Sequence, residues 1–415
     1  MPDRHAYRRR LVGALLALVL GLAACGRSGS TAASTTAATT SSTALETTTS
    51  IPVESTATGF QPLAMSFVSA SLGFALGHYQ CAQGVCYQLA RTSDDGVNWS
   101  LVAPAGSVVS TINPQGMYFA DAAHGWVWGK GAAFTANGGK SWSPLVLPAG
   151  SIVDSLAVVG SQAYFLLSTP TSSPPGSYVA SLFGQNWETS GGTSPVGGFS
   201  PVVAAAPGGF LAPGASLLGI KIVPVGTASP LWLYDPAGGT STSVPDPCAT
   251  TTGAAAIPLL SGGRYLASGT GDPASKAAFY VLCTANPGAG SSQKLIFGHS
   301  YSVNAQSSWS WTAVSSSAPP GGMGTAFATS PGGNFAIGAA SGASFVYTQR
   351  SASPSWTSLS DSALGGAPVT QLEWIDDSHV FAVIGGPEGA TLGPSATSAA
   401  YYSSNAGASF AKLAF

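Results

Sequence analysis

The stretch Thr92-Ser93-Asp94-Asp95-Gly96-Val97-Asn98-Trp99 decides the fold, because two close copies of it occur elsewhere in the chain. The second copy spans residues 135–142 (TANGGKSW) and the third spans residues 403–410 (SSNAGASF). A short Asp or Asn side chain accepts hydrogen bonds from the N–H groups of its own turn, and Gly supplies the positive φ that a tight turn needs. Each copy is therefore predicted to be a hairpin turn whose final aromatic residue starts the returning strand and packs between sheets.

The shared pattern is Ser/Thr-x-Asp/Asn-x-Gly-x-x-aromatic, and it is carried by Thr92, Asp94, Gly96, Trp99, Thr135, Asn137, Gly139, Trp142, Ser403, Asn405, Gly407 and Phe410. It resembles the Asp-box, or sialidase-type (BNR) repeat, of β-propellers. In that family the box is a turn between the third and fourth strands of a blade, on the face away from the active site. The resemblance therefore implies that these residues are structural.

A second repeated segment precedes the first two turns. Residues 67–77 (FVSASLGFALG) return 52 positions later as residues 119–129 (FADAAHGWVWG), with apolar residues on both sides of a polar turn. Self-similarity at about 50 residues, with four short strands in each unit, is typical of propeller blades. Weaker units follow at residues 163–187, 202–246, 253–314, 327–356 and 374–410. The prediction is an all-β propeller over residues 59–415 with seven blades, six or eight being the alternatives.

Closure of such a ring normally needs the first and last blades to share strands. Residues 59–64 are predicted to be either that closing strand or the plain end of a linker.

The composition agrees with a protein rich in turns and short strands. Only 7% of the 415 residues are charged, whereas 53 are Gly and 29 are Pro. This balance argues against surface helices carrying many Glu and Lys residues. The net charge of −2 provides no basic patch, so nucleic acid is not an expected partner.

The first 24 residues read as a lipoprotein signal peptide. Four Arg residues between positions 4 and 10 precede an apolar run at residues 11–20, and Leu22-Ala23-Ala24-Cys25 resembles a bacterial lipobox. The resemblance implies that Cys25 is lipidated and becomes the mature N-terminus; an ordinary secretory signal with an incidental Cys is the alternative. Residues 25–58 are predicted to form a Ser/Thr-rich disordered linker. The expected location is the extracytoplasmic face of the cell membrane, where the lipid is the membrane contact.

Four further cysteines remain, namely Cys81, Cys86, Cys248 and Cys283. An even number in an exported chain favours disulfides. Cys81 and Cys86 flank a short loop with a central Gly and are predicted to pair, which leaves Cys248 for Cys283. A zinc site is the alternative; no metal and no cofactor are predicted.

Ligand binding is expected on the face that carries the loops between second and third strands and the links between blades. The residues singled out there are His78, Tyr79, Lys130, Asp272, Lys276 and Glu388, together with the Pro-rich loop at residues 168–177. Asp121, His124, Asp376, Asp377 and His379 fall instead in turns between first and second strands. Such Asp residues usually bind their own backbone.

Three function classes remain open from the sequence: a binding scaffold, a hydrolase, and a structural surface protein whose stalk and sugars matter more than any site. Photosystem assembly-factor-like propellers share the blade pattern and are non-enzymatic scaffolds, which favours a scaffold that binds an envelope protein or glycan. Sialidases also resemble the chain, but the family's three-Arg cluster is matched only by Arg91, Arg264 and Arg350, two of which adjoin turns of the wrong face. A sialidase-like or other glycoside hydrolase is therefore the alternative, and no catalytic residue is assigned.

Overall fold

The computed structural model describes residues 59–82, 84–172, 175–188, 192–195, 202–204, 209–213, 217–222, 231–250, 259–262, 277–288, 291–301, 309–315, 321–386 and 397–415. The predicted signal peptide, the predicted lipidation site Cys25 and the predicted linker lie outside these residues. Among the described helices, none has the length and hydropathy needed to cross a bilayer.

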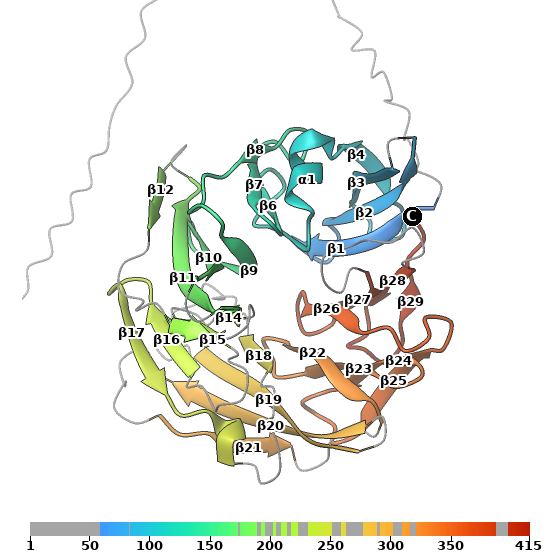
Figure 1. Cartoon of the computed structure of the whole chain (residues 1–415). Coiled ribbons are helices and arrows are strands. Elements are labelled where there is room, and N and C mark those ends of the chain that lie inside the picture. The colour runs from blue at the N-terminus through green and yellow to red at the C-terminus, as the bar shows by residue number, and fades with distance from the viewer. Residues whose placement is uncertain are drawn as a thin grey trace, which may run out of the picture. The chain divides into compact units, whose positions relative to one another are not determined.

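Seven antiparallel sheets follow one another along the described residues (Figure 1). The first holds β1 (Gln61–Phe67), β2 (Gly73–Cys81), β3 (Gly84–Thr92) and β4 (Ser100–Pro104), and the second holds β5 (Gly116–Phe119), β6 (Gly125–Trp128), β7 (Ala132–Thr135) and β8 (Ser143–Pro144). The third holds β9 (Ile152–Val159), β10 (Gln162–Pro170), β11 (Tyr178–Asn186), β12 (Gly192–Pro195) and β13 (Val202–Ala204), and the fourth holds β14 (Gly209–Pro213), β15 (Leu218–Ile222), β16 (Leu231–Asp235) and β17 (Thr240–Val244).

The remaining sheets have the same strand order. The fifth holds β18 (Leu259–Gly262), β19 (Ala277–Gly288), β20 (Ser291–Tyr301) and β21 (Thr312–Ser315), the sixth β22 (Met323–Thr329), β23 (Phe335–Ala340), β24 (Ser344–Gln349) and β25 (Trp356–Asp361), and the seventh β26 (Val369–Trp374), β27 (Val380–Gly385), β28 (Ser398–Ser403) and β29 (Ala411–Lys412). Two short helices, α1 (Gly106–Ile112) and η1 (Pro247–Thr250), lie in links between sheets.

The sheets are arranged as the blades of a propeller. First strands of neighbouring sheets contact one another, as in the pairs β1–β5, β9–β14, β14–β18, β18–β22 and β22–β26, and β1 also contacts β27 and β28 of the seventh sheet. The chain of sheets therefore closes into a ring (Figure 1). The predicted all-β propeller is confirmed, and the seven sheets correspond in order to the seven repeat units.

Apolar side chains on both faces of each sheet explain why the second strands read as nearly continuous apolar runs. In β10, Tyr164 and Leu166 pack with Leu218 and Tyr234 of the fourth sheet, whereas Phe165 and Leu167 pack toward Trp126 of the second. A sheet that is covered on both faces buries successive residues rather than alternate ones. The core is thus divided among the interfaces between neighbouring sheets.

The ring is closed by side chains rather than by a strand shared between the first and last sheets. Residues 61–67 form β1 and pair with β2 of their own sheet, so the closing-strand interpretation of residues 59–64 is wrong. Ser398 of β28 takes the place of a shared ladder: its N–H donates to Gln61 Oε1 at 2.9 Å, and its Oγ donates to the carbonyl of Pro62 at 2.6 Å. Below this joint, Phe415 packs on Phe60 and Trp99.

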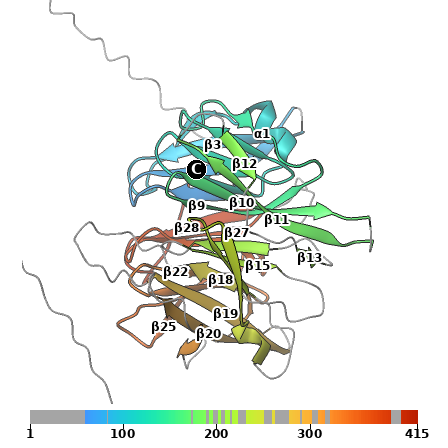
Figure 2. The ribbon, with the colours of Figure 1, turned by 90° about the vertical axis from the view of Figure 1, so that its left-hand side faces the viewer.

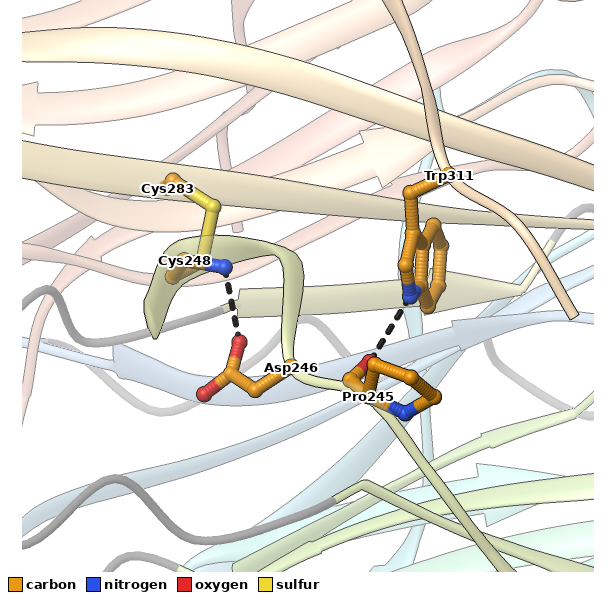
Figure 3. Close-up of a disulfide and its surroundings, with 5 residues drawn as sticks. All are labelled: Pro245, Asp246, Cys248, Cys283 and Trp311. Atoms are coloured by element: carbon orange, nitrogen blue, oxygen red, sulfur yellow. Dashed lines mark hydrogen bonds between the residues drawn. A yellow bond between two sulfur atoms is a disulfide. The ribbon is translucent and has the colours of Figure 1, made fainter. Parts of the chain in front are cut away.

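Both predicted disulfides are present. Cys81 and Cys86 are joined near the tip of the β2–β3 hairpin, with their Cα atoms 5.9 Å apart. Cys248 of η1 is joined to Cys283 of β19, which ties the link after the fourth sheet to the fifth (Figure 3). This second disulfide is buried. Beside it, Cys248 N–H donates to Asp246 Oδ1 at 2.9 Å, and Trp311 Nε1 donates to the carbonyl of Pro245 at 2.8 Å (Figure 3).

The third sheet departs most from the repeat. The end of the predicted unit at residues 163–187 carries no repeated turn, because β11 runs through residues 178–186 as a strand. Residues 168–170, which were assigned to the Pro-rich loop, belong to β10. The third and fourth repeat units also divide differently, because β13 at residues 202–204 pairs with β11 rather than joining the fourth sheet.

Candidate functional site

The three repeated turns are held by the same hydrogen bonds. In each, the Ser or Thr hydroxyl donates to the Asp or Asn oxygen at 2.8, 3.0 and 2.9 Å for Thr92, Thr135 and Ser403. The same hydroxyl accepts the N–H of the Gly four residues later at 3.1, 2.9 and 3.0 Å. Because the hydroxyl and the carboxylate or amide bind one another and the backbone within the turn, these residues hold the hairpin.

Two Asp-x-x-His turns lie beside these repeated turns. Asp121 Oδ1 accepts the N–H groups of Ala123 and His124, and Asp376 Oδ1 accepts those of Ser378 and His379. In both turns the His Nδ1 lies 2.8 Å from the Asp carboxylate. Each imidazole then stacks on the aromatic residue just before a repeated turn, His124 on Phe134 and His379 on Tyr402. The recurrence of one arrangement in two sheets indicates a structural unit.

Backbone contacts place both kinds of turn on the same side of the ring, here called the turn face. Gly138 N–H donates to the carbonyl of Ala123 at 2.8 Å, and Ala406 N–H donates to that of Ser378 at 2.7 Å. Asp377 joins neighbouring sheets on this face, since its Oδ1 accepts the hydroxyl of Ser330 at 2.7 Å. The ionisable groups assigned to these turns are thus bound to the fold itself.

The opposite side, here called the loop face, carries the described residues between second and third strands (82, 129–131, 171–172 and 175–177, for example) and helix α1. The hairpins β2–β3, β10–β11 and β19–β20 have strands of 9 to 12 residues, whereas those of the β6–β7 hairpin have 4. Figure 2 shows the β10–β11 hairpin reaching out from the ring on the side of α1. Long hairpins on one face and tight turns on the other make the two faces unequal.

Two of the predicted ligand-face residues, His78 and Lys130, belong to the first and second sheets. His78 of β2 is buried opposite Tyr87 of β3, and burial lowers the pKa of His78. The Tyr87 hydroxyl donates to Asn113 Oδ1 at 3.2 Å, and Lys130 N–H donates to the carbonyl of Ile112 at 2.8 Å. The turn that ends α1 therefore contacts both Tyr87, the neighbour of His78, and Lys130. The Lys130 side chain is exposed, whereas His78 is buried.

Tyr79, also predicted for this face, is half-buried next to the Cys81–Cys86 disulfide. Asp272, Lys276 and Glu388 lie outside the described residues.

The sequence reasoning missed a carboxyl group at the inner edge of the loop face. Asp154 is the third residue of β9, and its Oδ2 accepts the hydroxyl of Ser168 on β10 at 2.5 Å. Burial raises the pKa of Asp154 to about 6, against the lowering effect of the Ser168 hydrogen bond. A lone Asp in the apolar run IVDSLAVV was the available signal.

The described residues do not bring together the set that a sialidase-like enzyme needs. Arg91 is exposed, with its guanidinium 6.0 Å from the Phe74 ring centre, and Arg350 is exposed after β24; Arg264 lies outside the described residues. The Tyr401 hydroxyl does bind a carboxylate, Asp361, but it donates its proton there. Burial and this hydrogen bond raise the pKa of Tyr401, which is the reverse of an activated nucleophile. No grouping of three metal-ligating side chains occurs within the described part of the chain.

Comparison with known proteins gives solved structures alone, since no family model matches the chain and no curated protein matches it. The chain is similar to the structure of YCF48 bound to D1 peptide, at 14% identity over 71% of this chain and 79% of that one, with a TM-score of 0.42. It is also similar to the β-propeller domain of the Trilobed protease from Pyrococcus furiosus (8% identity, 87% and 97% covered, TM-score 0.36). A puromycin-hydrolyzing peptidase of Mycobacterium tuberculosis matches at 12% identity over 84% of this chain and 52% of its own, with a TM-score of 0.49. Such likenesses concern the fold alone, because one fold can host unrelated functions.

Proposed function

We propose that this chain is a lipid-anchored, extracytoplasmic β-propeller that acts as a scaffold binding a protein or glycan of the cell envelope. The observation that carries the proposal is the inequality of the two faces. Turn-face polar groups bind one another within tight turns, whereas the loop face presents long hairpins, one of them clamped by the Cys81–Cys86 disulfide. A preorganised projecting hairpin loses little entropy on binding, which favours recognition.

The finer parts of the proposal rest on the sequence. The three repeated turns are assigned to the Asp-box class because of their pattern, and the hydrogen bonds described above suit that structural role. The leader, the LAAC motif and the Ser/Thr-rich stretch support an anchor at Cys25 and a tether that carries the propeller away from the membrane. Mass spectrometry of the mature protein should find a lipid on Cys25; an unmodified terminus at another residue would remove the anchor from the proposal.

The scaffold is tested by cross-linking the full-length protein in intact cells of its own host and identifying the partner that co-purifies. One variant replaces loop residues 171–177 with a two-residue Asn-Gly turn. A second variant replaces residues 80–86, between Tyr79 and Tyr87, with the same turn. The matched control changes exposed turn-face residues, Val97→Ser with Lys140→Ala. We expect the loop-face variants to lose the partner and the control to keep it. Loss in the control but not in the loop variants, or no partner above background in any of them, would overturn the proposal.

A further inference from the structure

The innermost strands share an irregularity that makes their residues comparable between sheets. The register between first and second strands shifts by one residue at Leu63 in β1, Asp154 in β9, Thr325 in β22 and Thr370 in β26. A β-bulge places one extra residue on the bulged strand and redirects its side chain. These four residues therefore occupy one position in four sheets, near the loop-face end of the strand.

The fold does not need a charge at this position. Leu63 packs in the apolar interface between the first two sheets. Thr325 Oγ1 accepts the N–H of Val369 at 3.1 Å, and Thr370 Oγ1 donates to the carbonyl of Gly385 at 2.9 Å. The first, sixth and seventh sheets thus fill the position with an apolar or hydroxyl side chain. The architecture therefore does not explain why the third sheet carries a carboxylate there.

The partner of Asp154 is equivalent as well. Val153 and Val369, the residues before the bulge, pair with Leu167 and Ile384, so that Ser168 and Gly385 are the next residues along the second strands. The hydroxyl-to-carbonyl bond of the seventh sheet is replaced in the third by the bond from Ser168 to Asp154. A Thr or Asn at position 154 would serve this structural contact equally.

The carboxylate is isolated among the described residues. Asp154 and Glu373 are the only charged side chains in the seven innermost strands as bounded above, and Glu373 lies three residues past the bulge of β26, which is about 10 Å further toward the turn face. Asp154 Oδ2 binds Ser168, and no second hydrogen-bond donor to the carboxylate is found in the described part of the chain. No cation is bonded to this carboxylate among the described residues, so above its pKa the group is a half-buried anion, a state that costs free energy unless a cation pairs with it.

Resting on the proposed scaffold function, we propose that Asp154 anchors a basic side chain, Lys or Arg, of the protein that the loop face binds. Three observations carry this assignment. The Asp154 carboxylate is negatively charged, it lies with Ser168 at the inner end of the third sheet, and the fold does not need a carboxylate there. A charge-assisted hydrogen bond in a partly dry site contributes enough that its loss should weaken binding about 10- to 100-fold.

The test uses the full-length protein in detergent and a random heptapeptide library whose central residue is Lys, Arg, acetyl-lysine or citrulline. We expect Lys or Arg peptides to be enriched, and D154N to bind the best of them about 10- to 100-fold more weakly than the parent. E373Q is the matched control and should bind as the parent does. Equal binding by D154N, or equal enrichment of the neutral libraries, would overturn the assignment.

The pH dependence of peptide binding separates an anchoring role of Asp154 from a merely structural one. Binding by the parent protein should weaken between pH 7.5 and pH 5 as Asp154 is protonated, and D154N should show no such change. Among the described residues, the strands packed against β9 add no carboxyl or imidazole group: β14 has no ionisable side chain, and burial raises the pKa of Tyr164 of β10. If D154N keeps the cross-linked partner that the loop-face variants lose, the scaffold stands and the anchor fails; if no peptide binds and no partner is found, both fail.

Discussion

Gln371 of the seventh sheet and Met65 of the first exchange two hydrogen bonds across the joint of the ring. Met65 N–H donates to Gln371 Oε1 at 2.8 Å, and Gln371 Nε2 donates to the carbonyl of Met65 at 2.6 Å. The side-chain amide thereby reproduces the donor and acceptor pair that a neighbouring strand would present.

Replacing this amide should weaken the joint. Gln371→Leu keeps most of the volume but leaves the N–H and C=O of Met65 without partners, and we expect a loss of about 2–4 kcal/mol in the free energy of unfolding. Urea denaturation followed by Trp fluorescence measures it. Gln80→Ala, at the exposed tip of β2, is the control and should change stability by less than about 0.5 kcal/mol. Equal midpoints for Q371L and the parent would show that the joint does not depend on this pair.

The repeated turns predict opposite effects for two small substitutions. Ala406 has φ of 56°, a conformation that a residue with a Cβ adopts at a cost, whereas the equivalent Gly138 has φ of 69° and a Cβ there would lie 2.8 Å from the carbonyl oxygen of Ala122. Ala406→Gly should stabilise the protein by up to about 1 kcal/mol, because relief of this strain exceeds the added entropy of the unfolded chain. Gly138→Ala should destabilise it by about 1–3 kcal/mol. Thermal unfolding of both variants tests the signs, and a stabilising Gly138→Ala would contradict the geometry.

The two disulfides should contribute unequally. In the chain-entropy treatment, the bridge over a sequence separation of 35 contributes about 4 kcal/mol and the bridge over a separation of 5 about 2 kcal/mol. Replacing Cys248 and Cys283 together by Ala should therefore lower the urea midpoint more than replacing Cys81 and Cys86. Mild dithiothreitol followed by alkylation and peptide mapping should label the half-exposed hairpin pair first. Earlier labelling of the buried pair would argue against this order.

Asp154 should also make stability depend on pH. Its pKa is raised from 3.8 to about 6, so the folded state favours the protonated form. This stability is fully present below about pH 4 and is lost as the pH rises through 6, by at most about 3 kcal/mol and by less where solvent screens the charge. D154N should therefore be more stable than the parent at pH 8 and similar to it at pH 4. Denaturation of both proteins at the two pH values measures the difference, and an unchanged gap would contradict it.

The sequence reveals the fold wherever local chemistry determines structure. The turn at residues 92–99 can be recognised from the sequence because its residues bind one another within eight positions. The Cys81–Cys86 disulfide is equally local, since it spans a single hairpin. Both could be assigned without knowing which sheets are neighbours.

The parts that the sequence could not predict depend on contacts between distant segments. Gln371 and Met65 are separated by 306 positions, and nothing near either residue marks it as half of a joint. Asp154 was missed for a related reason: its position becomes visible only when the register shift of β9 is compared with those of β1, β22 and β26. Periodicity finds strands, but it does not locate the one-residue shift that redirects a side chain.

The closed ring without a shared strand has a consequence for the order in which the protein folds. Each sheet is built from one continuous segment, so the first can complete all its ladders while the seventh is still unmade. The joint between Gln61, Met65, Gln371 and Ser398 is the exception, since it closes a loop of more than 300 residues, the largest entropic step of assembly. Contacts across this joint should therefore form last during folding, and unfolding should begin by separation of the first and seventh sheets there.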